Sequence, residues 1–177
     1  MASSFLPSKC SFLSWMIKLS LQQAARFGSL SLCRLFLTIS EDKNPADLGG
    51  YTPLYHAASN AHVSVCRLIL DSVSDKNPAN RNGYTPLHVA AMLGHLKICR
   101  LFLSNLQQDK NPAIGHPSNC GNTVLHVAAV HGHEEICKLI MGNVDVNNCR
   151  NFDGDTPIDL ARKSGQSSVI HLLQNSE

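Results

Sequence analysis

A pentapeptide that reads Gly-Tyr-Thr-Pro-Leu in its fullest form returns along the chain at a nearly constant interval. It stands at residues 50–54, 83–87, 121–125 and 154–158, so its glycines are 33, 38 and 33 residues apart. Two further motifs keep step: a cysteine, a basic residue and leucine at 33–35, 66–68, 99–101 and 137–139, and Asp-Lys-Asn-Pro at 42–45, 75–78 and 109–112. Periods of about 20–50 residues are typical of repeat proteins, whose stacked units bury each other's apolar faces. The chain is therefore expected to fold as an array of repeats.

Each unit carries the signals of two short helices. Thr85 can cap a helix N-terminus with its hydroxyl, and Pro86 suits the first helical position, where a missing N–H costs nothing. Gly94 supplies the left-handed conformation that commonly ends a helix. An apolar run then predicts a second helix over residues 96–104, before Asn-Pro and Asn-Gly turns. Helices this short are marginal alone, so their stability has to come from neighbouring units.

This pattern resembles the ankyrin repeat. Residues 83–95, Gly-Tyr-Thr-Pro-Leu-His-Val-Ala-Ala-Met-Leu-Gly-His, carry the resemblance most fully. The resemblance implies an all-α ankyrin-repeat solenoid of stacked helix-turn-helix units with β-turn finger loops. The expected organisation is an N-terminal extension over 1–20 and an ankyrin-repeat domain over 21–177, with a degenerate repeat at 21–49, full repeats at 50–82, 83–120 and 121–153, and a C-terminal cap at 154–177.

The sequence departs from the family pattern at four places. Ala61 stands where glycine is expected, so the turn there should be strained or shifted onto Asn60. Tyr55 replaces the expected histidine, and Val124 replaces the proline. Five additional residues follow the second helix of the unit 83–120, four of them within 112–121. Insertions in repeat arrays map to loops, often on the binding face.

Composition limits the compartment and the partner. Hydrophobic residues make up 44% of the chain, enough for a sizeable core, and the net charge of +2 is too small to indicate a nucleic-acid partner. Seven cysteines form no CxxC pair, and four recur at one repeat position, which indicates packing residues of a reducing compartment, cytoplasmic or nuclear. The apolar stretch at 12–17 is short for a signal peptide, and no stretch approaches the ~20 residues of a membrane span.

Enzymatic and metal chemistry find little support. His88 and His126 occupy the family's histidine position, where the resemblance implies a hydrogen-bonding strut between a helix start and the adjacent turn. His116, Cys120 and Cys149 lack the fourth ligand of a structural zinc site. Because the repeated cysteines have four copies in register, they do not read as one catalytic nucleophile. No enzyme activity, metal or cofactor is expected.

The resemblance also implies a concave groove formed by the fingers and the exposed side of each first helix. Tyr51 and Tyr84, one period apart, should stack along one edge of it. Tyr, Met and Arg are typical interface anchors, although Met92 and Leu93 could instead pack between repeats. The candidate partner-binding residues are Leu48, Tyr51, His56, Ser59, Asn60, Arg81, Asn82, Tyr84, Met92, Leu93, Asn119, Asn122, Val130, His131, Phe152 and Asp155.

Three other interpretations stay open. Asn77 and Asn147 occupy loop positions that resemble substrates of an asparaginyl hydroxylase, although a turn-forming role is favoured. Arg34, Arg67, Arg100 and Lys138 form a basic row, for which a solvated surface is favoured over an acidic partner. The chain as a whole is expected to be a monomeric adaptor or scaffold that binds another protein; the alternative is a targeting fragment, or a relative, of a larger ankyrin-containing enzyme or effector.

Overall fold

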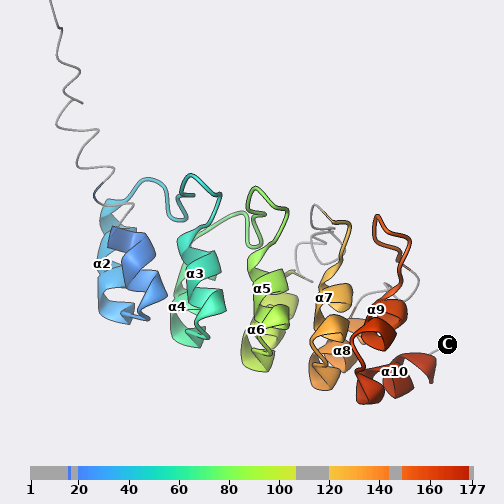
Figure 1. Cartoon of the computed structure of the whole chain (residues 1–177). Helices are drawn as coiled ribbons and strands as arrows, with labels where there is room; N and C mark the ends of the chain where they lie inside the picture. Colours follow the sequence, from blue (N-terminus) through green and yellow to red (C-terminus); the bar gives the residue numbers. More distant parts are fainter. Residues whose placement is uncertain (1–15, 17–19, 107–119, 144–148, 176–177) are drawn as a thin grey trace, which may run out of the picture.

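The computed structural model describes residues 16, 20–106, 120–143 and 149–175, which form pairs of short helices stacked in a row (Figure 1). Loops gather along one side of the row. The described residues contain no strand, and the all-α solenoid is confirmed. The pairs are residues 20–26 with α2 (Leu30–Ile39), α3 (Pro53–Ser59) with α4 (Val63–Leu70), α5 (Pro86–Met92) with α6 (Leu96–Leu106), α7 (Val124–Val130) with α8 (Glu134–Met141), and α9 (Pro157–Lys163) with α10 (Ser167–Gln174).

The first helices begin where the Thr-Pro motif predicts. Thr85 precedes α5, and its Oγ1 accepts the backbone N–H of His88 at 3.3 Å. Thr52 does the same for α3. α7 begins without proline at Val124. The caps satisfy N–H groups that have no partner inside the helix, so even helices of seven residues begin at a defined position.

A left-handed residue separates the two helices of each pair. Gly94 takes this role with φ +76°, as predicted. Ala61 takes it in the pair α3–α4 with φ +59°, while Asn60 stays at φ −104°. Ala61 is the one non-glycine residue with positive φ in the described ranges, so the strain falls on this alanine and is not shifted to Asn60.

The core runs along the stack as one continuous cluster. The first helices pack on one another through small residues, and the second helices form a parallel layer. The repeated cysteines lie between them, and Cys33, Cys66, Cys99 and Cys137 are each 0% exposed, as their packing role predicts. Burial raises the pKa of Cys33 to about 11 and that of the other three thiols to about 12, so they stay protonated at neutral pH.

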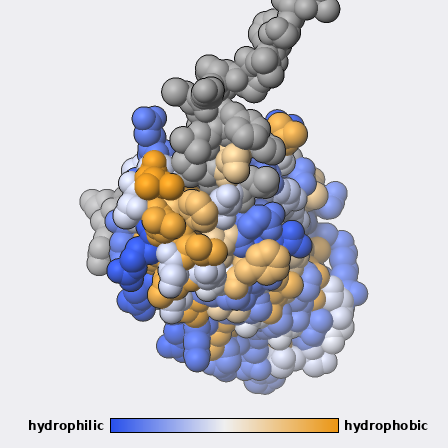
Figure 2. Space-filling model, turned by 90° about the vertical axis from the view of Figure 1, so that its left-hand side faces the viewer, coloured by the Kyte–Doolittle hydropathy of each residue, from blue (hydrophilic) through white to orange (hydrophobic). Residues whose placement is uncertain are grey.

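The two ends of the row differ in polarity. The end formed by residues 20–26 and α2 shows a gathering of apolar side chains (Figure 2).

In the described parts of the chain, no helix has the length and apolar character that crossing a membrane requires.

Candidate functional site

Two buried histidines tie the first helices α5 and α7 to the next finger, as the resemblance implies. The Nδ1 atom of His88 accepts the backbone N–H of Thr85 at 3.3 Å, and its Nε2 lies 3.2 Å from the carbonyl oxygen of Asn122. His126 repeats this arrangement with Thr123 and the carbonyl oxygen of Asp155, at 3.2 and 3.0 Å. Because Nδ1 accepts, the proton must lie on Nε2, which donates to the carbonyl. These imidazoles are structural struts.

A second row of polar side chains joins the units at the opposite end of the first helices. The Nε2 atom of His95 lies 3.1 Å from the carbonyl oxygen of Ser59, and that of His133 lies 3.1 Å from the carbonyl oxygen of Met92. His62 and Gln166 make the equivalent contact with Arg26 and Val130. The side chain that follows each of these turns therefore forms a hydrogen bond to the preceding repeat.

The finger turns are shaped by one acidic or amide side chain each. Oδ1 of Asn80 accepts the backbone N–H groups of Asn82 and Tyr84, both at 2.9 Å. Asp47 and Asn151 do the same in the fingers before α3 and α9. Sequence reasoning missed these three residues, although a side chain that bonds the backbone two residues ahead is the usual mechanism of such turns.

The residue after each turn-shaping side chain projects from the fingertip. Leu48 is 86% exposed and Phe152 is 74% exposed, and Arg81 is also exposed at the same position. Neighbouring fingers are joined through these residues, because the N–H of Arg81 donates to the carbonyl oxygen of Gly49 at 3.0 Å. Asn119, the equivalent residue before α7, lies outside the described ranges. The fingertip row is defined here as Leu48, Arg81 and Phe152.

An aromatic cluster lies at the base of the first two fingers. The ring centroids of Tyr51 and Tyr55 are 4.9 Å apart, and the ring of His56 lies 6.2 Å from each. Tyr84 packs on His88 at 5.8 Å. Burial, with the nearby hydroxyls of Tyr51 and Tyr84, raises the pKa of Tyr55 to about 12. Within the described structure Tyr51 and Tyr84 thus pack on local partners, with Tyr55 close to both.

Tyr55 was not predicted to belong to the site. Its signal in the sequence was the replacement of the expected histidine by a second tyrosine. Burial also lowers the pKa of His56, so this imidazole is neutral at physiological pH. The aromatic cluster, Tyr51, Tyr55, His56 and Tyr84, therefore presents rings and hydroxyls without a formal charge.

The ends of the first helices supply a third row of predicted residues. Leu93 is 46% exposed, and Asn60 and His131 at the equivalent positions are also exposed. The residues just before them, Ser59, Met92 and Val130, are half-buried. Met92 packs against the core, which is the alternative that the sequence left open. Leu93 is the better placed of the two to meet a partner.

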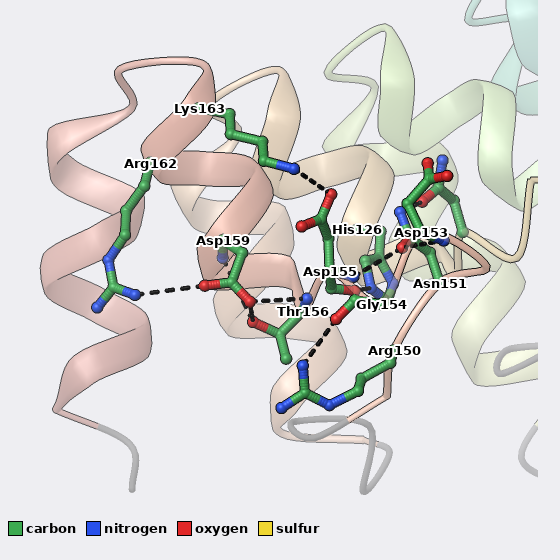
Figure 3. A network of polar contacts seen from close by, with 11 residues as sticks. His126, Arg150, Asn151, Asp153, Gly154, Asp155, Thr156, Asp159, Arg162 and Lys163 are labelled. Carbon is green, nitrogen blue, oxygen red and sulfur yellow. Dashed lines mark hydrogen bonds and ion pairs between the residues drawn. The ribbon is translucent and has the colours of Figure 1, made fainter.

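Asp155 and Asn122 make several contacts within the protein. Asp155 forms an ion pair with Lys163, and its N–H donates to Asn151 (Figure 3). The amide oxygen of Asn122 accepts Nδ2 of Asn151 at 3.0 Å. Around them, the carboxylate of Asp159 accepts the Thr156 hydroxyl and N–H, which lowers its pKa. This network joins the last finger to α9.

With these contacts in place, comparison with known families decides the identity of the repeats. A family model described as ankyrin repeats (3 copies) matches residues 21–114 and 103–177. The chain is an ankyrin-repeat protein. No curated protein matches it. Ankyrin repeats are generally protein–protein interaction modules, and members of the family are typically non-catalytic.

Other candidate chemistry of this ankyrin-repeat protein can be placed only in part. No group of three or more His, Cys, Asp or Glu side chains suited to a metal occurs among the described residues; His116 lies outside them. The carboxamide oxygen of Asn77 accepts the N–H of Leu87 at 3.1 Å, and Asn77 is 3% exposed, so a hydroxylase would have to open this turn. Hydroxylation of Asn77 stays a prediction, and Asn147 lies outside the described ranges.

Proposed function

We propose that this protein is an adaptor or scaffold that binds a partner protein through the fingertip row and the aromatic cluster. The observation that carries the proposal is the fingertip row itself. Two of its three residues, Leu48 and Phe152, are large apolar side chains that are mostly exposed to solvent. They occupy turn positions that the backbone fixes, so no packing requirement of the fold explains them.

The aromatic cluster supports the same surface. Tyrosine is enriched at the energetic centres of interfaces because its rigid ring buries much area while its hydroxyl still forms hydrogen bonds. Tyr51, Tyr55 and Tyr84 provide three such side chains within two consecutive repeats, beside the exposed Leu48 and Arg81. A partner with an apolar projection and hydrogen-bonding groups would fit this arrangement.

The proposal includes a monomeric protein in the cytosol or nucleus. The four repeated cysteines support a reducing compartment, because they are free thiols buried in the core. The basic row is not part of the proposed surface. Arg34, Arg67 and Arg100 are exposed on the second helices, and Lys138 pairs with Glu134 at 2.6 Å.

The test compares two triple variants at exposed positions. The fingertip variant carries Leu48→Ser, Arg81→Ser and Phe152→Ser, and the control carries Arg34→Ser, Arg67→Ser and Arg100→Ser on the outer helices. Circular dichroism first establishes that both are folded. Each is then used for affinity capture from cell lysate, and captured proteins are purified and titrated against each variant.

The expected result is a partner bound equally by the wild type and the control, with a dissociation constant at least about ten-fold weaker for the fingertip variant. Loss of binding in the control alone would move the interface to the basic row and overturn the proposal. Capture of no specific protein by the wild type would favour the second candidate, a targeting segment whose active part lies outside this chain.

A further inference from the structure

The outer face of the first repeat is built like an interior face. Leu32 stands at the position that Val65, Ile98, Ile136 and Val169 occupy in the later second helices, where the exposure is 1%, 0%, 2% and 0%. Leu32 itself is 47% exposed. In each later repeat, the second helix contacts the second helix of the preceding repeat. In the described structure, the first repeat therefore exposes the packing face that is buried in every later repeat.

This face forms an apolar patch with a recess. Phe27 is 75% exposed just before α2, and Leu35 and Ile39 on α2 are each 54% exposed. Apolar side chains gather on this end of the row (Figure 2). Phe27 also lines an open pocket of about 380 Å³. Its lining residues are Ser20, Gln23, Ala24, Phe27, Ser29, Leu32 and Phe36. Terminal repeats of a solenoid usually have a polar outer face, because an uncovered apolar one costs solubility.

The other end of the molecule follows that rule. On α10, Val169 and Leu173 point into the stack, while the exposed residues are polar: Ser167, Ser168, His171, Gln174 and Asn175. The apolar character of the first repeat is therefore a property of that end alone, and it calls for an occupant.

We propose that the N-terminal segment of this chain, residues 1–19, covers the apolar face of the first repeat as an intramolecular cap. The segment joins the described chain at Ser20, which is itself a wall of the pocket. α2 spans about 15 Å, and an extended residue covers about 3.5 Å, so the segment can reach every part of the face. Its composition fits the task, with nine large apolar side chains: Met1, Phe5, Leu6, Phe12, Leu13, Trp15, Met16, Ile17 and Leu19.

Tethering favours this occupant over a second copy of the protein. A short flexible connection holds a segment at an effective concentration in the millimolar range, whereas a second copy has to bind from the much lower concentration of free protein. The covered face would leave the fingertip row free, so the cap does not depend on the proposed binding function.

Trp15 gives a direct test, because it is the only tryptophan of the chain. In the full-length protein its fluorescence emission is expected to be blue-shifted, and its quenching by acrylamide several-fold weaker, relative to the same protein in denaturant. Leu32→Asp should shift the emission to the red and restore quenching. Leu93→Asp, a residue of nearly equal exposure in the third row, is the matched control and should change neither.

Circular dichroism and urea unfolding establish that each variant is folded, and Phe27→Ser serves as a second variant that alters only an exposed side chain of the patch. The proposal is overturned if Trp15 is as accessible in the wild type as in denaturant, or if neither Leu32→Asp nor Phe27→Ser changes its emission. A blue shift that appears only with rising protein concentration, together with a dimer mass by light scattering, would assign the face to a second copy instead.

Discussion

The repeats that contain α3 and α5 follow one sequence pattern, yet they are stabilised differently. In the α5 repeat, His88 caps the helix and reaches the carbonyl oxygen of Asn122, and Gly94 makes the turn without strain. In the α3 repeat, Tyr55 stands at the histidine position and packs on Tyr51, and Ala61 makes the turn in a left-handed conformation.

The difference shows where sequence and fold are least optimised for each other. The α3 repeat loses a strut and accepts backbone strain, and the same repeat carries the centre of the aromatic cluster. Departures from local rules concentrate at functional sites, because selection there acts on recognition as well as on stability. Single substitutions at the strut, at the turn glycine and at Ala61 measure how much each feature contributes to the free energy of unfolding.

Removal of the strut should have the largest effect. His88→Ala leaves a buried N–H and a carbonyl of two different repeats without this partner and opens a cavity, so we expect a loss of about 3 kcal/mol in the free energy of unfolding. Urea denaturation followed by circular dichroism measures it. His95→Ala, which removes one contact at a half-buried site, should cost about 1 kcal/mol. Equal losses would mean that the strut gives the α5 repeat no special stability.

The turn glycine should come next. Gly94→Ala forces alanine into φ +76° and places its Cβ 2.7 Å from the His133 ring, so we expect a loss of about 2 kcal/mol. Gly165→Ala is the control, because the φ of +70° is similar and nothing lies within 4 Å of the added Cβ. It should lose about 1 kcal/mol. If both lose the same amount by thermal or urea unfolding, the close approach of the next repeat contributes nothing.

Acid should weaken the repeat that contains α7. Burial lowers the pKa of His126 below its usual value near 6.5, so the unfolded chain binds the proton more readily. Stability is then complete above about pH 6.5 and falls as the pH drops toward the folded pKa, by at most about 1.4 kcal/mol per pH unit for this residue. Unfolding at pH 7.5 and 5.5 should show a smaller difference in His126→Gln than in the wild type. An unchanged difference would exclude His126 as its source.

Most of the repeat architecture could be predicted from the sequence, because its signals act over a few residues. Three motifs in register predicted the helix pairs and the Thr-Pro caps, because propensity and capping act over a few residues. The sequence also marked an irregular turn at residues 60–61, but the structure decided that Ala61 takes the left-handed conformation. Burial at Leu32 and contacts at Tyr55 depend on neighbouring repeats instead. Leu32 and Ile98 occupy the same position of the repeat, and only the stacked structure shows that Ile98 is buried and Leu32 is exposed. The partner-binding residues stay predictions, because the repeat pattern determines packing and leaves exposed positions free.

The smallest change should be a gain of stability at the strained turn. Ala61→Gly removes a left-handed cost of about 1–2 kcal/mol and adds the backbone entropy cost of glycine, so a net gain of about 0.5–1 kcal/mol is expected. Arg67→Gly, on the exposed side of α4 in the same repeat, lacks the positive φ and should lose about 1 kcal/mol. Opposite signs in urea unfolding would show that the α3 repeat carries strain that a single substitution relieves. A loss in both would mean that Ala61 contributes contacts worth more than its strain, and the repeat would then be as well adapted to its own sequence as the α5 repeat.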